Sequence, residues 1–192
     1  MRGSDAAVAA LNDAIALHAR VRDAGVATTV AAAEAIATSF RQGGKLLVFG
    51  NGGSSADAAH MAAELVGRFM RERRGYAAIA LTTDACVLTS VSNDYGFDQV
   101  FARQIEALGR PGDVALGITT SGASANVVRA LETARARQLT TIALTGRDGG
   151  PAGRAVDVHV NVPSAVTPRV QEVHMTLLHV ICDLVETELS EQ

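Results

Sequence analysis

The chain has 192 residues, a length that fits one domain with a substantial buried core. Hydrophobic residues make up 48% of the chain and charged residues 19%, which excludes an intrinsically disordered protein. The formal net charge is −3 and the charges are interspersed, so the sequence offers no basic face and we expect no nucleic-acid partner.

The cysteines and the apolar runs indicate the compartment. Cys86 and Cys182 lie in apolar runs without CxxC spacing, which disfavours a disulfide framework and fits a reducing environment. Asp5 and Asp13 stand where a signal peptide would be apolar. No apolar run reaches the roughly 18 to 20 residues that span a bilayer. We therefore expect a cytoplasmic protein without membrane association.

The first 42 residues carry a helical pattern. Apolar residues recur at helical spacing over 5–42, and the turn Asp23–Gly25 divides the segment into a helical pair. The pair ends at Gly43 and Gly44. We expect residues 1–42 to pack against a neighbouring subunit, and residues 43–192 to form an α/β sandwich with a C-terminal helix.

From residue 45 short apolar runs alternate with helical stretches. Strands are expected at 45–49, 77–81, 114–118, 141–144 and 156–162. Helices are expected at 54–70, 85–92, 99–108, 124–137 and 169–189. The alternation predicts a single doubly wound, flavodoxin-like α/β domain in which helices flank five parallel strands. The basic cluster Arg68–Arg74 is interpreted as the solvated end of a helix.

Two junctions between a strand and a helix have an unusual composition. In such sheets ligands bind at the carboxyl ends of the strands, where helix N-termini present N–H groups. The first junction is Gly50–Ser55 and the second is Gly117–Ser124. The second places four hydroxyl groups ahead of a helix that Ser124 would cap. An ordinary Ser/Thr-rich turn is the alternative, but the two junctions together favour a phosphate site.

The first junction contains Gly50-x-Gly52, which invites comparison with dinucleotide-binding loops. Ser55 stands where that fingerprint requires a third glycine or an alanine. No acidic residue follows at the expected distance, and no Walker A sequence is present. We therefore expect no nucleotide cofactor.

Histidines and acids gather on two of the expected helices. His60 and Glu64 are four residues apart and share one helix face, although such a pair is most often a surface ion pair. Gln171 and His179 are eight residues apart, about 12 Å along a helix axis and roughly 80° around it. Spacing alone therefore does not make these two ligands of one metal. His174 fits equally well as a satisfied interface histidine.

Several of these motifs together resemble a known family. The run Gly50–Leu65 is similar to the signature of bacterial phosphoheptose isomerases, which belong to the sugar isomerase (SIS) family. The same resemblance extends, in order and at matching spacing, from about residue 44 to residue 184. Its other motifs are Ala80–Asp84, Asn93–Tyr95, Thr119–Gly122, Pro163–Ser164 and Arg169–His174.

The resemblance implies an aldose–ketose isomerase in a homotetramer with active sites between subunits. Its reaction would interconvert sedoheptulose 7-phosphate and D-glycero-D-manno-heptose 7-phosphate through an enediol(ate), the first step of ADP- or GDP-heptose biosynthesis for lipopolysaccharide or other glycans. The implied acid/base pair is Glu64 and His179, and the implied zinc ligands are His60, Glu64, Gln171 and His179. The implied substrate-binding residues are Asn51, Gly52, Gly53, Glu64, Asn93, Asp94, Thr119, Thr120, Ser121, Ser124 and Gln171.

Departures from the family pattern are small, and three alternatives stay open. Thr119 replaces the commoner Ser and Ser55 the commoner Ala, and Val166 leaves no carboxylate in the loop before Gln171. One alternative is a related tetrameric scaffold that binds the bacterial replication initiator, but it lacks the counterparts of Glu64 and His179. The others are an isomerase for a different sugar phosphate and the sensing domain of a regulator, which the absence of a DNA-binding segment disfavours.

Overall fold

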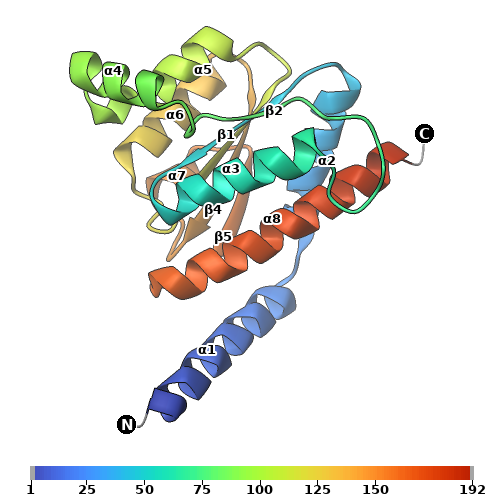
Figure 1. The fold of residues 1–192 in the computed structure, drawn as a ribbon, viewed down its shortest axis with the longest axis vertical. Coiled ribbons are helices and arrows are strands. Elements are labelled where there is room, and N and C mark those ends of the chain that lie inside the picture. The colour runs from blue at the N-terminus through green and yellow to red at the C-terminus, as the bar shows by residue number, and fades with distance from the viewer. Residues whose placement is uncertain (1–2, 191–192) are drawn as a thin grey trace.

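The computed structural model describes residues 3–190, and these form an α/β fold around one parallel sheet (Figure 1). The strands are β1 (Leu46–Gly50), β2 (Ala78–Ala80), β3 (Val114–Thr119), β4 (Thr140–Gly146) and β5 (Val158–Val162). Their order in the sheet is β2-β1-β3-β4-β5, with every neighbouring pair parallel. This is the flavodoxin-like order. The predicted fold class is confirmed.

Helices connect and cover these strands. They are α1 (Gly3–Ala24), α2 (Ala27–Arg41), α3 (Gly53–Val66), α4 (Ala85–Tyr95), the 3₁₀ turn η1 (Phe97–Gln99), α5 (Ala102–Leu108), α6 (Ala125–Ala136), α7 (Gly150–Arg154) and α8 (Thr167–Ser190). The N-terminal helical pair is present, and its break falls at Gly25, where φ is +102° and glycine is favoured. The expected bounds 1–42 and 1–192 include terminal residues outside the described range.

The core forms two layers, one on each face of the sheet. Residues of α2, α3 and α8 pack on one face with Leu46, Val48 and Leu116. Residues of α5, α6 and α7 pack on the other with Leu47, Phe49 and Ala115. The central strands β1 and β3 bury side chains on both faces, which explains their continuous apolar runs. Helix α1 extends away from this body and packs against α8 (Figure 1).

The segment after α3 differs from the prediction. Helix α3 ends at Val66 instead of continuing to residue 70, and a loop follows. Arg68–Arg74 is not a solvated helix end, because the Arg73 side chain is 7% exposed and pairs with the fully buried Glu186. Glu186 also accepts hydrogen bonds from three backbone N–H groups of this loop. A buried carboxylate on a distant helix therefore binds the loop that follows α3, and helical periodicity alone does not reveal this contact.

Two smaller differences lie near the candidate site. Helix α7 was not predicted, because its five residues include Gly150, Pro151 and Gly153 and carry no apolar pattern. The expected helix 99–108 is divided into η1 and α5. Among residues 3–190 no helix combines the length and apolar character needed to cross a bilayer.

Candidate active site

The two unusual junctions lie side by side at one edge of the sheet. Strand β1 pairs with β3 so that Gly50 is opposite Ile118, and the loops Gly50–Ser55 and Thr119–Ser124 follow directly. Helices α3 and α6 begin at the ends of these loops, so two positive helix ends are directed at the same edge. The geometry favours an anionic group bound between the loops.

The first loop depends on its glycines for close approach. A Cβ atom on Gly50 would lie 2.8 Å from the carbonyl oxygen of Ile118, so the two strand ends could not pack as they do. Gly52 has a φ of +58°, in the region that favours glycine. Beside this loop is a cavity of about 140 Å³. Its lining residues are Gly50, Asn51, Gly52, Ser55, Thr82, Leu88, Phe97 and Phe101.

A pair of amides joins the first loop to helix α6. The Asn51 amide donates to Oδ1 of Asn126 (2.8 Å), and the Asn126 amide donates to Oδ1 of Asn51 (2.9 Å). Asn126 is buried. The predicted substrate residue Asn51 therefore has its side chain engaged with a partner that the prediction missed. The only sequence signal was a polar residue on the buried stripe of α6.

The second loop carries a hydroxyl network. Oγ1 of Thr119 lies 2.9 Å from Oγ of Ser124 and 3.3 Å from Oγ of Ser121. Ser124 occupies the N-cap position of α6, but its side chain bonds to Thr119 and makes no capping hydrogen bond, so the predicted cap is present by position only. Thr120 follows Thr119 at the end of β3 and is partly exposed. Helix α7 braces this loop, since the Ala152 N–H donates to the Gly122 carbonyl.

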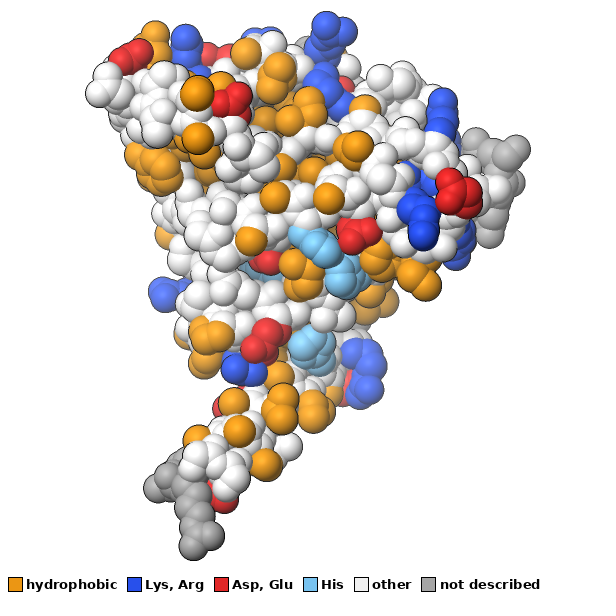
Figure 2. Space-filling model, in the orientation of Figure 1, with side chains coloured by type: hydrophobic (Ala, Val, Ile, Leu, Met, Phe, Trp, Pro, Cys, Tyr) orange, Lys and Arg blue, Asp and Glu red, His pale blue; other side chains and the backbone are white. Residues whose placement is uncertain are grey.

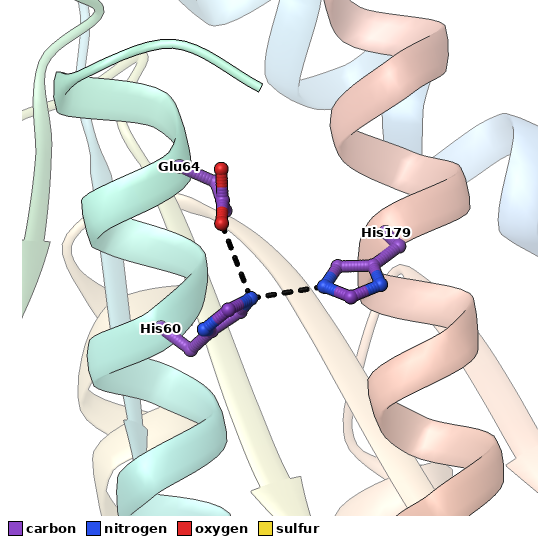
Figure 3. A group of neighbouring side chains, drawn as sticks. All are labelled: His60, Glu64 and His179. Atoms are coloured by element: carbon purple, nitrogen blue, oxygen red, sulfur yellow. Dashed lines mark hydrogen bonds and ion pairs between the residues drawn. The ribbon is translucent and has the colours of Figure 1, made fainter. Parts of the chain in front are cut away.

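Three predicted catalytic and metal-binding side chains converge between α3 and α8 (Figure 3). Nε2 of His60 lies 2.9 Å from Nε2 of His179 and 3.3 Å from Oε1 of Glu64. The ligand atoms of all three lie within 4.8 Å of one another. The side chains of His60 and Glu64 are 41% and 24% exposed, so the cluster is open to solvent. Figure 2 shows histidine surfaces gathered over α3 and α8 on this face.

The donor set of this cluster fits a metal ion. Catalytic zinc sites often use two histidines and one glutamate as protein ligands. A fourth position on the metal is then left for water or substrate. Two Nε2 atoms that face each other are held together either by one proton or by a shared cation. The structure therefore supports a possible metal group of His60, Glu64 and His179.

The structure places the other predicted residues away from this cluster. The Gln171 amide packs against Gly53 at the start of α3, about two helical turns before His60. Asn93 and Asp94 lie exposed on α4, where the Asn93 amide donates to the Asp94 carboxylate (2.8 Å). Within one chain the loops Gly50–Ser55 and Thr119–Ser124, the cluster and α4 thus form three separate groups of polar side chains.

Two buried titratable groups lie near the site. Burial raises the pKa of Asp57 to about 6, while the neighbouring His60 lowers it, and one of its carboxylate oxygens is buried without a hydrogen-bond partner among the described residues. Burial also lowers the pKa of His174 to about 4, although its Nε2–H donates to the Thr145 carbonyl (2.9 Å). His174 is a core histidine that joins α8 to β4, and its Nδ1 is buried without a hydrogen-bond partner among the described residues. The alternative of a satisfied interface histidine therefore does not describe its place within this chain.

Comparison with known proteins identifies the family. A family model described as an SIS domain matches residues 11–146. A phosphoheptose isomerase from Roseiflexus sp. (strain RS-1) is 56% identical over 163 residues, which cover 85% of this chain and 83% of that protein. The chain belongs to the phosphoheptose isomerase family. The resemblance inferred from the motifs is thereby confirmed.

Solved structures of phosphoheptose isomerases have the same fold. The chain superimposes on the enzyme from Neisseria gonorrhoeae with a TM-score of 0.91 at 45% identity, covering 96% of this chain and 98% of that chain. For the enzyme from Francisella tularensis the TM-score is 0.94 at 37% identity, covering 97% and 100%. The family likeness therefore includes α1 and α8 as well as the sheet.

Proposed function

We propose that this chain is a phosphoheptose isomerase that interconverts sedoheptulose 7-phosphate and D-glycero-D-manno-heptose 7-phosphate, at the start of ADP- or GDP-heptose biosynthesis. One observation carries the proposal. The carboxylate of Glu64 and the imidazole of His179 come from different helices and meet in one open cluster. The cluster lies on α3, whose N-terminus begins at the first of the two loops with the composition of a phosphate site. An enzyme that moves protons on a sugar phosphate needs these two features together.

The reaction moves one proton between adjacent carbon atoms. Glu64 removes the proton from C1 of the ketose, and the electron pair forms the C1–C2 double bond of an enediol(ate). His179 donates a proton to the C2 oxygen and later removes the proton from the C1 oxygen. Glu64 then returns its proton to C2, which gives the aldose. The open side of the cluster gives a sugar access to both groups.

The phosphate group binds at the sheet edge. Hydroxyl groups of Thr119, Thr120, Ser121 and Ser124 and the N-termini of α3 and α6 supply donors without a lysine or arginine. Asn51, Gly52 and Gly53 belong to the first loop, which follows β1 next to the end of β3. This arrangement anchors the end of the substrate that does not react.

The metal of this site is proposed to be zinc, held by His60, Glu64 and His179 with Gln171 as a fourth ligand. When bound, it would polarise the substrate carbonyl and stabilise negative charge on the enediolate oxygens. Gln171 would have to leave Gly53 to join the cluster, and a glutamine is an uncommon zinc ligand. Glu64 would serve as base only while its carboxylate is free of the metal.

A homotetramer in the cytoplasm, with each active site shared between subunits, completes the proposal. Helices α1 and α8 border an apolar hollow of about 590 Å³, and Leu11 and Ile15 beside it are 64% and 67% exposed. Apolar side chains cluster along α1 in Figure 2. A surface of this kind fits another copy of the chain. Exposed Asn93 and Asp94 would then reach a neighbouring subunit's site, with residues 1–42 serving in the packing.

Incubation of the purified protein with sedoheptulose 7-phosphate, followed by NMR of the products, tests the proposal. We expect the heptose 7-phosphate to accumulate to equilibrium and chelator to slow its formation. Absence of turnover with this ketose, but turnover with a pentose or hexose phosphate, would assign another substrate. Absence of turnover with all of them, together with capture of the replication initiator, would assign the scaffold role.

A further inference from the structure

The buried glutamate of α8 controls the loop that follows α3. The carboxylate of Glu186 is fully buried and accepts hydrogen bonds from the backbone N–H groups of Phe69 (2.7 Å), Met70 (2.8 Å) and Arg71 (2.9 Å). It also pairs with Nε of Arg73 at 2.9 Å. A buried charge is tolerated when its lone pairs are satisfied in this way. One side chain of α8 thus fixes the conformation of residues 69–73.

Arg73 connects this loop to the end of α3. Its guanidinium donates to the carbonyls of Glu64, Leu65 and Gly67, each at 2.9 Å. Glu64 and Leu65 belong to the last turn of α3, whose carbonyls have no partner within the helix, and Gly67 is the C-cap residue. The guanidinium also lies over the ring of Tyr76, 4.2 Å from its centre. Arg73 therefore caps the turn of α3 from which the Glu64 carboxylate projects.

Phe69 connects the same loop to the imidazole of His179. The two ring centres are 5.3 Å apart and the rings are tilted by 34°. The imidazole of His60 lies on His179 as well, with ring centres 5.1 Å apart. His179 is consequently held between a phenyl ring and a second imidazole, which restricts its rotation.

We propose that Glu186, Arg73 and Phe69 form a positioning unit that fixes the catalytic carboxylate and imidazole relative to each other. Arg73 holds the backbone of Glu64, Phe69 holds the ring of His179, and Glu186 binds both of these residues to α8. The inference rests on the proposed roles of Glu64 and His179. None of the three residues belongs to the cluster itself, so they act through their neighbours.

Conservative substitutions with neighbouring controls test the unit. Phe69→Leu keeps an apolar side chain but removes the ring. Its control is Met70→Leu, which changes the exposed neighbouring residue. Arg73→Lys keeps the charge but loses the planar fork that reaches several carbonyls, and Arg74→Lys is its exposed control. Phe69→Tyr restores an aromatic ring and is expected to restore activity. Glu186→Gln is reserved for a stability measurement, because it leaves Arg73 buried without a counter-charge.

Two readouts separate positioning from general damage. We expect Phe69→Leu and Arg73→Lys to lower kcat for sedoheptulose 7-phosphate about tenfold or more while KM stays within twofold, because the phosphate loops are unchanged. We also expect the imidazole NMR signal of His179, assigned with His179→Gln, to shift in both variants and in neither control. A kcat within twofold of wild type in both variants, or an unshifted His179 signal in both, would overturn the proposal.

The NMR readout also keeps this inference separate from the proposed function. If the wild-type protein does not turn over the ketose phosphate, the proposed function fails, and the His179 signal alone then decides the positioning unit. A shift confined to Phe69→Leu and Arg73→Lys would support it. Identical signals in these variants and in the wild type would refute it.

Discussion

Nε2 of His60 and Nε2 of His179 face each other at 2.9 Å between α3 and α8. A hydrogen bond between them requires one ring to donate and the other to accept, so one tautomer of the pair is selected. When neither Nε2 carries a proton, their two lone pairs, with Glu64 Oε1 3.3 Å from His60 Nε2, can bind one cation. The pair therefore makes metal binding and proton transfer compete for the same atoms.

Zinc should bind once per chain and depend on both imidazoles. We expect His60→Asn and His179→Gln each to weaken zinc binding by roughly 100-fold or more, since only two of the three converging ligands remain. His18→Asn, on α1, is the control and should bind zinc as the wild type does. Calorimetry with Zn²⁺ checks this, and unchanged affinity in both cluster variants would exclude the site.

Breaking the hydrogen bonds between Asn51 and Asn126 should lower the affinity for substrate more than it slows the chemical step. In Asn126→Leu, the Asn51 amide loses its partner and the first loop is no longer joined to α6. We expect KM to rise about tenfold and stability to fall by about 1–3 kcal/mol, with kcat changed less. Steady-state kinetics and urea unfolding check both effects. A KM equal to that of the wild type would show that the pair does not shape the site.

His174 should make the fold sensitive to acid. Burial holds its folded pKa at about 4, below the ordinary 6.5, so its stabilising contribution is present above pH 6.5 and is lost as the pH falls towards 4. Asp57 acts in the opposite direction, because its folded pKa is raised to about 6. Between pH 7 and 5, we expect the wild type to lose about 2 kcal/mol more unfolding free energy than His174→Gln. Parallel pH dependence of the two proteins would contradict this.

A charge in the apolar hollow should dissociate the oligomer. Ile15→Asp places a carboxylate among the residues that line it, and burying that charge against another copy would be costly. Ala16→Asp adds the same charge at a neighbouring exposed position outside the hollow. We expect light scattering to report smaller particles for Ile15→Asp alone. Equal masses for both variants would mean that this face is not the interface.

The sequence was sufficient for the sheet and for part of the cluster. Apolar runs mark the central strands β1, β3 and β4 because both sheet faces are covered there, and glycine-rich loops mark the ligand edge. The edge strands β2 and β5 are partly exposed. His60 and Glu64 were predictable neighbours, since a helix brings residues four apart together. That His179 joins them depends on how α8 crosses α3, which local periodicity does not encode.

The features missed from sequence are long-range polar contacts. Glu186 lies on the apolar stripe of α8 beside Cys182 and Val185. An acidic residue at a position expected to be in the core is the one feature of the sequence that indicates a buried polar contact there. Its partners are more than a hundred positions earlier in the chain. Asn126 pairs with Asn51 across 75 positions in the same way. Such pairs follow from the folded topology and not from any local pattern.

The rate at which the C1 proton is lost in D₂O tests the central claim most directly. Proton NMR of sedoheptulose 7-phosphate follows C1 exchange and aldose formation in one sample, with wild type and Glu64→Gln compared at equal saturation. Because the amide cannot remove a carbon-bound proton, we expect both rates to fall roughly 100-fold or more, with sugar-phosphate affinity within a few-fold of wild type. Near-wild-type exchange in Glu64→Gln would contradict Glu64 as the base.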